Sequence, residues 1–248
     1  MTGRQDRDAV DRMGLRLQLR RAQAEAGDIA LLYADESEAL THPYLAHAWA
    51  ARGAELRVQA PGASRKVALM GALDAGTGEL VVSTSPTKTS ADVIALLRRL
   101  DWRYGPQPGC TRLPMVLVWD NGPVHTSRAT RAALAERPWI TVEWLPRYAP
   151  ELNAIERSWR DLKRHHLAHH TFKDAADLTC TVQAAVKQLN KERMNPHPCD
   201  NLSRFPWPVT RLAVLDQCWR KLGGWHGGSV FVGCDGGAGG GIACAVAF

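Results

Sequence analysis

The sequence predicts an α/β fold in which a mixed β-sheet is flanked by helices. Short apolar runs bounded by turn-forming residues are typical of buried strands, and amphipathic segments with helical spacing lie between several of them. The first strands follow one another directly, whereas the later ones alternate with helices. With 248 residues, the chain is long enough to bury a core of its own.

The first half of the chain predicts a helix and then three strands. Residues 10–26 form an arginine-rich helical segment that ends at Gly27. The continuous apolar run IALLYAD, 29–35, is typical of a strand covered on both faces. The segments VALMGALD, 67–74, and ELVVSTS, 79–85, are separated by AGTG and predict a hairpin.

The second half predicts strands that alternate with helices. Ser90 can cap a helix over 91–103, whose apolar residues recur at helical spacing. The strand MVLVWD, 115–120, and the strand ITVEWLP, 140–146, enclose a helix over 127–136 that Pro138 ends. Two further helices are expected over 154–166 and 174–193.

Composition narrows the choice of partner and compartment. Lys and Arg outnumber Asp and Glu by 31 to 25 and the sequence pI is about 9.2, which favours a polyanionic partner. The apolar runs are too short for a membrane span, and residues 1–21 are too charged for a secretory signal, so we expect a cytoplasmic protein without membrane contact. The six cysteines form no Cys-x-x-Cys pair and are expected to be free thiols.

Two carboxylates follow predicted buried strands. Asp35 and Asp120 are each placed at the carboxyl end of a strand, where an open sheet exposes residues to a ligand crevice. Each also has a structural alternative: Asp35 can begin a loop, and Asp120 opens the turn-forming stretch DNGP.

A third carboxylate lies on the helix predicted after Pro150. Glu156 can belong to a capping box with Asn153, which is the structural alternative. Glu156, however, shares a helix side with Arg160 and Lys163, away from the apolar side. A carboxylate aligned with two cations is the pattern expected of a metal ligand flanked by phosphate contacts.

Three carboxylates gathered without a cation would repel one another and raise at least one pKa. Hard oxygen donors suit Mg²⁺, and paired ions about 3.5 to 4 Å apart neutralise the attacking and leaving oxygens of a phosphodiester. The trio of Asp35, Asp120 and Glu156 therefore predicts two Mg²⁺ or Mn²⁺ ions.

The segments LLYADE, VLVWDNGPVH and LPRYAPELNAIERSWRDLK resemble, in this order, the DDE-type transposases of bacterial insertion sequences. The likeness is greatest to the insertion sequence 630 branch of the mariner-like superfamily, and it covers roughly 29–163. It implies a ribonuclease H-like fold, with Asp35, Asp120 and Glu156 as the catalytic, metal-binding acids. Thirty-five residues separate Asp120 from Glu156, close to the spacing typical of the family.

The resemblance also implies the chemistry and the partners. Such an enzyme cuts DNA at the ends of its element, and the released 3′-hydroxyl attacks target DNA. It implies a homo-oligomer on DNA, in the cytoplasm at the nucleoid. By position, Asn121 and His125 can orient the second acid or a phosphate, and Arg147 and Tyr148 can contact the DNA backbone, as can Arg160 and Lys163. A packing role for His125 and plain surface exposure for Arg147 and Tyr148 remain alternatives.

On this basis the chain is expected to have four parts. They are an N-terminal helical extension, 1–28, a ribonuclease H-like catalytic domain, 29–194, a C-terminal loop and helix, 195–222, and a disordered tail, 223–248, with ten glycines. Relatives carry a longer N-terminal helix-turn-helix region that recognises the terminal repeats. We therefore expect a separately encoded helix-turn-helix subunit as a partner. Ala154 replaces the proline usual in the family but removes no ligand.

Two other functions fit the same residues. Another ribonuclease H-like nuclease would cut DNA without joining it, and a truncated non-catalytic fragment would only bind DNA or a partner. The segment HHLAHH, 165–170, has histidine pairs at four-residue spacing, but a histidine-rich surface is favoured there over a metal site.

Overall fold

A computed structural model describes residues 6–47, 57–59, 62–106 and 112–194. The chain divides into two units, 1–196 and 197–248, and every described residue lies in the first. The segments predicted as a C-terminal loop and helix, 195–222, and as a disordered tail, 223–248, lie outside the described residues. In the described part, no helix combines the length and the apolar character needed to cross a membrane.

The described unit contains one five-stranded sheet of order β3-β2-β1-β4-β5. β1 pairs antiparallel with β2, and β2 pairs antiparallel with β3, whereas β1 pairs parallel with β4, and β4 pairs parallel with β5. This mixed topology is that of the ribonuclease H-like fold, as expected. The strands are β1 (Ala30–Leu40), β2 (Lys66–Asp74), β3 (Leu80–Ser85), β4 (Met115–Trp119) and β5 (Ile140–Trp144).

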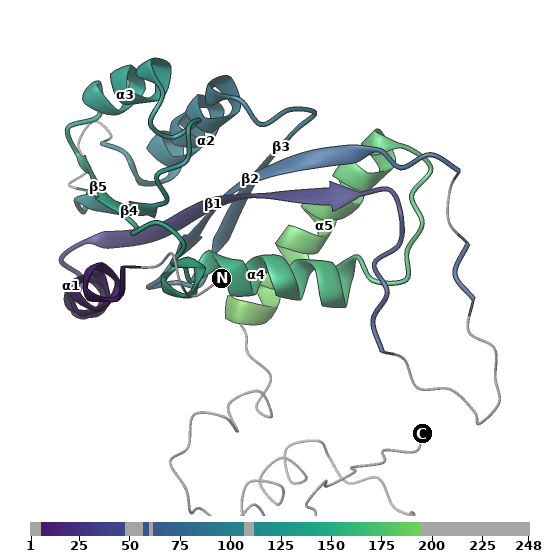
Figure 1. Ribbon diagram of the computed structural model, residues 1–248, viewed down its shortest axis with the longest axis horizontal. Coiled ribbons are helices and arrows are strands. Elements are labelled where there is room, and N and C mark those ends of the chain that lie inside the picture. The colour runs from purple at the N-terminus through teal and green to yellow at the C-terminus, as the bar shows by residue number, and fades with distance from the viewer. Residues whose placement is uncertain (1–5, 48–56, 60–61, 107–111, 195–248) are drawn as a thin grey trace, which may run out of the picture. The chain divides into compact units, whose positions relative to one another are not determined.

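Helices cover both faces of this sheet, as Figure 1 shows. The helices on one face are α1 (Arg7–Glu25), α4 (Ile155–Asp161) and α5 (Ala175–Met194), and those on the other are α2 (Ser90–Tyr104) and α3 (Arg128–Ala135). Each face buries its own apolar cluster, because side chains alternate along a strand. The hairpin and the strands and helices predicted between residues 90 and 146 are confirmed within one or two residues at each end.

Three local predictions were wrong. β1 does not end at Asp35 but continues to Leu40, because Ser37 and Ala39 are also buried and pair with β2. The N-cap of α2 is Thr89 rather than Ser90, since the Asp92 carboxylate accepts hydrogen bonds from the Thr89 backbone N–H and hydroxyl group.

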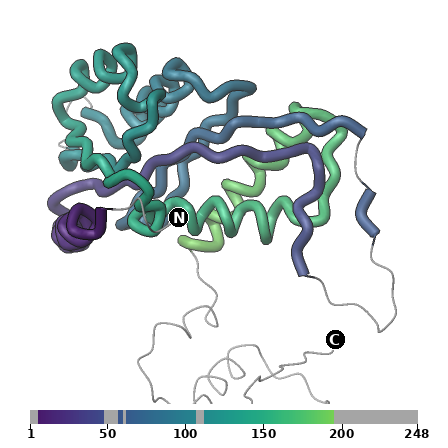
Figure 2. Tube along the Cα trace, viewed as in Figure 1, coloured from purple at the N-terminus to yellow at the C-terminus, as the bar shows by residue number. Residues whose placement is uncertain are grey.

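The helix expected over 154–166 is divided. α4 ends at Asp161 and continues as one π-helical turn, η3 (Leu162–His166). A short 3₁₀ helix, η2 (Pro150–Leu152), precedes it. α4 and β1 are far apart in the sequence but run side by side in the chain trace (Figure 2).

Candidate active site

The position of α4 on the sheet depends on a glycine that faces a tryptophan. Gly71 of β2 pairs with Asp35 of β1, so both residues face the same side of the sheet. A Cβ added at Gly71 would lie 2.6 Å from Cζ2 of Trp159, which is 3% exposed. The missing side chain at Gly71 therefore lets α4 approach the sheet beside Asp35.

The start of α4 is also tied to β1 by a side chain. Asn153 Nδ2 donates a hydrogen bond to the main-chain oxygen of Ala34, at 3.2 Å. No cap bond forms from the side chain of the N-cap residue, Ala154, and Glu156 is exposed. The capping box of Asn153 and Glu156, which was the structural alternative for Glu156, does not form, because Asn153 bonds β1 instead of the helix. This contact brings Glu156 toward the strand that carries Asp35.

The three predicted acids come from β1, from the end of β4 and from α4. Burial, followed by the charge of Glu156 and smaller effects of the charges of Glu36 and Asp120, raises the pKa of Asp35 to about 7. Asp120 follows directly after Trp119, as predicted. The charges of Glu156 and Asp120 thus reach Asp35, although the three carboxylates do not form a group with ligand atoms within 4.8 Å of one another.

A different trio has the tightest geometry among the described residues. Ligand atoms of Glu36, Asp120 and His125 lie within 4.8 Å of one another, and no other group of three or more acids, histidines or cysteines in the described part of the chain does so. Glu36 was not among the site residues predicted from the sequence. The available signal was the adjacent acid pair Asp35–Glu36, because alternation places two consecutive strand residues on opposite faces.

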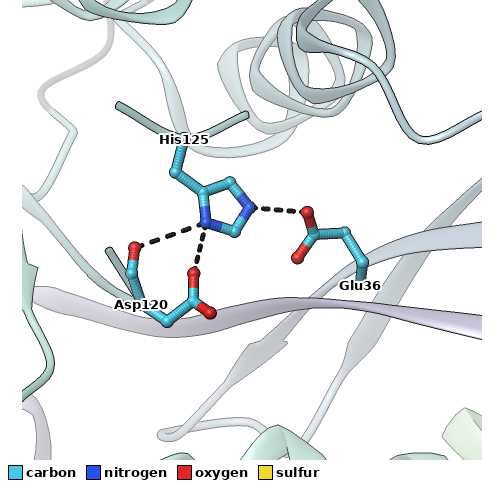
Figure 3. A group of neighbouring side chains, drawn as sticks. All are labelled: Glu36, Asp120 and His125. Atoms are coloured by element: carbon cyan, nitrogen blue, oxygen red, sulfur yellow. Dashed lines mark hydrogen bonds and ion pairs between the residues drawn. The ribbon is translucent and has the colours of Figure 1, made fainter. Parts of the chain in front are cut away.

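His125 joins the two acids of this second trio (Figure 3). Its Nδ1 lies 2.5 Å from Oδ1 of Asp120, and its Nε2 lies 2.9 Å from Oε1 of Glu36. Burial opposes a charge on the ring, but the two carboxylates outweigh it and raise the pKa of His125 to about 9. The same contact with His125 lowers the pKa of Asp120. The imidazole is therefore a cation at neutral pH.

Asn121, unlike His125, has its side-chain hydrogen bond to a residue other than Asp120. Its Nδ2 donates to the main-chain oxygen of Leu145, at 2.8 Å, and so joins the loop after β4 to the end of β5. Arg147 and Tyr148 lie exposed in the loop before η2, and Tyr148 has a φ of 61°.

Basic side chains gather beside Glu156. Arg160, Lys163 and Arg164 line a groove of about 490 Å³ with the segment Tyr44–His47. Burial lowers the pKa of Lys163, the charge of Glu156 opposes this, and Lys88 lowers it further. Lys163 therefore lies within electrostatic reach of Glu156, whereas Arg147 and Tyr148 are not among the residues that line the groove.

The remaining metal-ligating candidates give no further site in the described residues. In the segment HHLAHH, His166 Nε2 lies 3.8 Å from Oε2 of Glu192. No histidine of this segment belongs to a group of three possible metal ligands among the described residues. Cys180 is an exposed free thiol, as predicted, and the other five cysteines lie outside the described residues.

A ribonuclease H-like sheet with acids in the middle of one central strand and at the end of the next is typical of a class of enzymes that cut phosphodiesters. Within this class, residues 30–179 match the family model described as DDE superfamily endonuclease. The match covers more than half of the chain, and the chain belongs to this family.

One curated relative is the insertion element IS630 uncharacterized 39 kDa protein of Shigella sonnei. It is 36% identical over 132 residues, which are 53% of this chain and 37% of that protein. The matched part thus spans well under half of the relative's length.

Two solved structures are similar in fold. The Mos1 transposase paired-end complex with left transposon end is 17% identical, with a TM-score of 0.49, and the match covers 76% of this chain and 61% of that one. The catalytic core domain of BIV integrase is 19% identical, with a TM-score of 0.40, and the match covers 78% and 98%.

Proposed function

We propose that residues 29–194 are the catalytic domain of a transposase that cuts the DNA ends of its element and joins the 3′-hydroxyl to target DNA. The observation that carries this proposal is the raised pKa of Asp35, which lies partly buried within reach of the charges of Glu156 and Asp120. Repulsion among such charges is relieved by a bound cation. Membership of the DDE superfamily endonucleases supports the same reading.

The donor set fits hard divalent cations. Three carboxylates from β1, the β4 end and α4 offer oxygen ligands only, which Mg²⁺ and Mn²⁺ prefer. We assign two such ions to Asp35, Asp120 and Glu156. When bound, the pair supplies charge neutralisation at the attacking and leaving oxygens of the scissile phosphate.

The protein's own groups then have separate tasks. Asp35 is partly buried and fixed in the middle of β1, so it provides the rigid side of the site. Asp120 and Glu156 are exposed and can approach the substrate. His125 and Asn121 hold the loop that carries Asp120, through the Asp120 carboxylate and the Leu145 carbonyl group.

The groove lined by Arg160, Lys163 and Arg164 is assigned to the DNA backbone. These cations lie on the same helix and turn as Glu156, so a phosphate bound by them lies next to the acids. Arg147 and Tyr148, exposed before η2, are assigned to a further stretch of backbone. Such contacts give affinity with little sequence selectivity.

Selectivity for the element ends requires a further part. We assign this selectivity to a helix-turn-helix subunit that is encoded separately. We assign the joining of two element ends to a homo-oligomer of this chain on DNA. The protein would work in the cytoplasm at the nucleoid, where such DNA is accessible.

The test uses the purified chain, Mn²⁺, a supercoiled plasmid and a labelled duplex with a 3′-hydroxyl end. We expect nicked plasmid and labelled plasmid, and Asp35→Asn, Asp120→Asn and Glu156→Gln should each abolish both products. Glu151→Gln, an exposed glutamate in η2, is the matched control and should retain them. Nicking without joining would identify a nuclease instead, and DNA binding without either product would identify a non-catalytic fragment.

A further inference from the structure

We propose that Glu36 is a positioning residue for Asp120 and acts on it through the ring of His125. This inference rests on the proposed function and deepens it, since Asp120 is one of the assigned metal ligands. Glu36 would contact neither the cations nor the DNA. It would set the direction in which the Asp120 carboxylate points.

The three side chains form a row in which the most buried group, the ring of His125, lies between the two carboxylates (Figure 3). The His125 side chain is 1% exposed, Glu36 is 14% exposed and Asp120 is 53% exposed. The ring therefore lies between a largely covered carboxylate, that of Glu36, at 2.9 Å and an exposed one, that of Asp120, at 2.5 Å. Since its two nitrogens face different acids, the ring cannot turn without breaking one contact.

The contacts on Asp120 select one of its two oxygens. Oδ1 accepts a hydrogen bond from the backbone N–H of Gly122, at 3.0 Å, as well as its contact with His125. Both of these contacts end on Oδ1 and neither ends on Oδ2. One oxygen is thus fixed by the protein, and the other is left to bind a cation.

The ring of His125 is itself held from several sides. Its centroid lies 4.2 Å from that of Trp119, with the planes tilted by 32°. The backbone N–H of His125 donates to the carbonyl group of Gly122, at 3.1 Å. A Cβ at Gly122 would lie 3.0 Å from Oδ1 of Asp120 and 3.2 Å from Nδ1 of His125, so glycine allows the close approach.

The strand direction argues that Glu36 is not a metal ligand. Asp35 shares its side of the sheet with Gly71 and hence with α4. Glu36 is the next residue and therefore faces the other side, which α2 and α3 cover. Two consecutive acids would thus serve one site from two faces, Asp35 as a ligand and Glu36 as the anchor of the histidine.

A double-mutant cycle on the full chain tests this proposal. Mn²⁺ affinity is measured by calorimetry for the parent chain, Glu36→Ala, His125→Ala and the double variant. Each single change should weaken Mn²⁺ binding by about 10- to 100-fold, as for other partners of metal ligands. Glu36→Ala should cost less than about twofold when His125 is already alanine, because Glu36 then has nothing to act on. Glu36→Gln, which keeps an oxygen for the ring, should restore part of the affinity.

Controls separate positioning from folding. Glu38→Ala removes a carboxylate from the same strand that contacts Lys66 and Lys88 instead of His125, and it should bind Mn²⁺ within about twofold of the parent. Unfolding midpoints without metal are recorded for every variant. If His125→Ala does not fold, His125→Gln takes its place in the cycle.

Three results would overturn the proposal. An equal loss on Glu36→Ala in both backgrounds would make Glu36 an independent ligand. Parent-like Mn²⁺ affinity in both single variants, with a lower unfolding midpoint, would show that the Glu36–His125 contact is purely structural. In that case, loss of Mn²⁺ binding in Asp120→Ala would still support the proposed function. Absence of Mn²⁺ binding by the parent chain would overturn the metal site and with it the role of Glu36.

Discussion

The side chain of Asn153 donates to the main-chain oxygen of Ala34, across 119 positions of sequence, at 3.2 Å. This bond fixes the start of α4 against β1, next to Asp35. The position of Glu156 relative to Asp35 therefore depends on a neutral amide that is itself 6% exposed.

Asn153→Asp should disturb this contact with little change of shape. The new carboxylate would face the Ala34 carbonyl group without a proton to donate, and it would add a charge close to the other acids. We expect a loss on the order of 3 kcal/mol in the free energy of unfolding at pH 8. Asn121→Asp removes a similar bond to Leu145 at an exposed position and should cost about 1 kcal/mol. Urea titrations of both variants check this order, and a larger loss for Asn121→Asp would contradict it.

Gly71→Ala should move α4 away from the sheet. The added methyl group would overlap the ring of Trp159, so we expect a loss of about 1–3 kcal/mol in stability together with weaker Mn²⁺ binding. Gly62→Ala is the control, since no atom lies within 4 Å of a Cβ there, and it should change stability by less than about 0.5 kcal/mol. Equal denaturation curves for Gly71→Ala and the parent would contradict the close packing.

Asp35 should make the metal-free chain less stable as the pH rises. Its pKa is raised from 3.8 to about 7 by burial and by Glu156, so the native state binds a proton in this range that the unfolded state has released. The free energy of unfolding in EDTA should therefore fall between about pH 4 and pH 7 and then level off. Asp35→Asn should lack this fall and be more stable than the parent at pH 8, as denaturation at pH 5 and pH 8 would show.

Asp92→Asn is the control, because the pKa of Asp92 is shifted in the direction opposite to that of Asp35. Burial opposes the charge of Asp92, but hydrogen bonds from Ser85, Thr89 and Thr87 lower its pKa to about 2. Its stabilising effect is present above the ordinary pKa and is lost only as the pH falls toward about 2. Asp92→Asn should therefore destabilise the chain at pH 8. A stabilised Asp92→Asn, or a destabilised Asp35→Asn, would refute this assignment of charges.

Arg160→Ala combined with Lys163→Ala should weaken DNA binding and flatten its dependence on salt. Loss of two phosphate contacts lowers the slope of log affinity against log salt by about 2. Arg98→Ala combined with Arg99→Ala removes two exposed cations of α2, on the other face of the sheet, and should leave the slope unchanged. Fluorescence anisotropy over a range of KCl concentrations measures both slopes, and identical slopes would remove the groove from the DNA path.

Arg20→Ala should loosen the docking of α1 more than Arg16→Ala does. Both arginines contact Glu143, whose side chain is 4% exposed, but Arg16 is 57% exposed and Arg20 only 22%. Arg20 also places two nitrogens on one oxygen of Glu143, at 2.9 and 2.7 Å. We expect losses of about 1–3 kcal/mol for Arg20→Ala and below about 1 kcal/mol for Arg16→Ala. Hydrogen exchange of α1 amides provides the measurement, and the reverse order would contradict it.

Local patterns predicted most elements of the fold correctly. The apolar run before Asp35, the hairpin around AGTG and the helical spacing of α2 each depend on neighbouring residues, which is why they could be read from the sequence. The end of β1 could not, because residues 36–40 remain in the strand through pairing with β2. The sequence alone left open the alternative of a capping box at Asn153 for a similar reason, since the side chain bonds a partner on β1.

The sequence by itself determined which groups are available: the acids after and within apolar runs, the basic residues beside Glu156, and the motif order that resembles the DDE-type transposases. Only the tertiary structure decided which of these groups meet. Glu36 and His125 are 89 positions apart and form their contact because strand alternation turns Glu36 away from Asp35, toward the loop after β4. The physical reason is that the type of a residue fixes what its side chain can do chemically. Which side chains come into contact depends on strand register and on the side of the sheet that each residue faces.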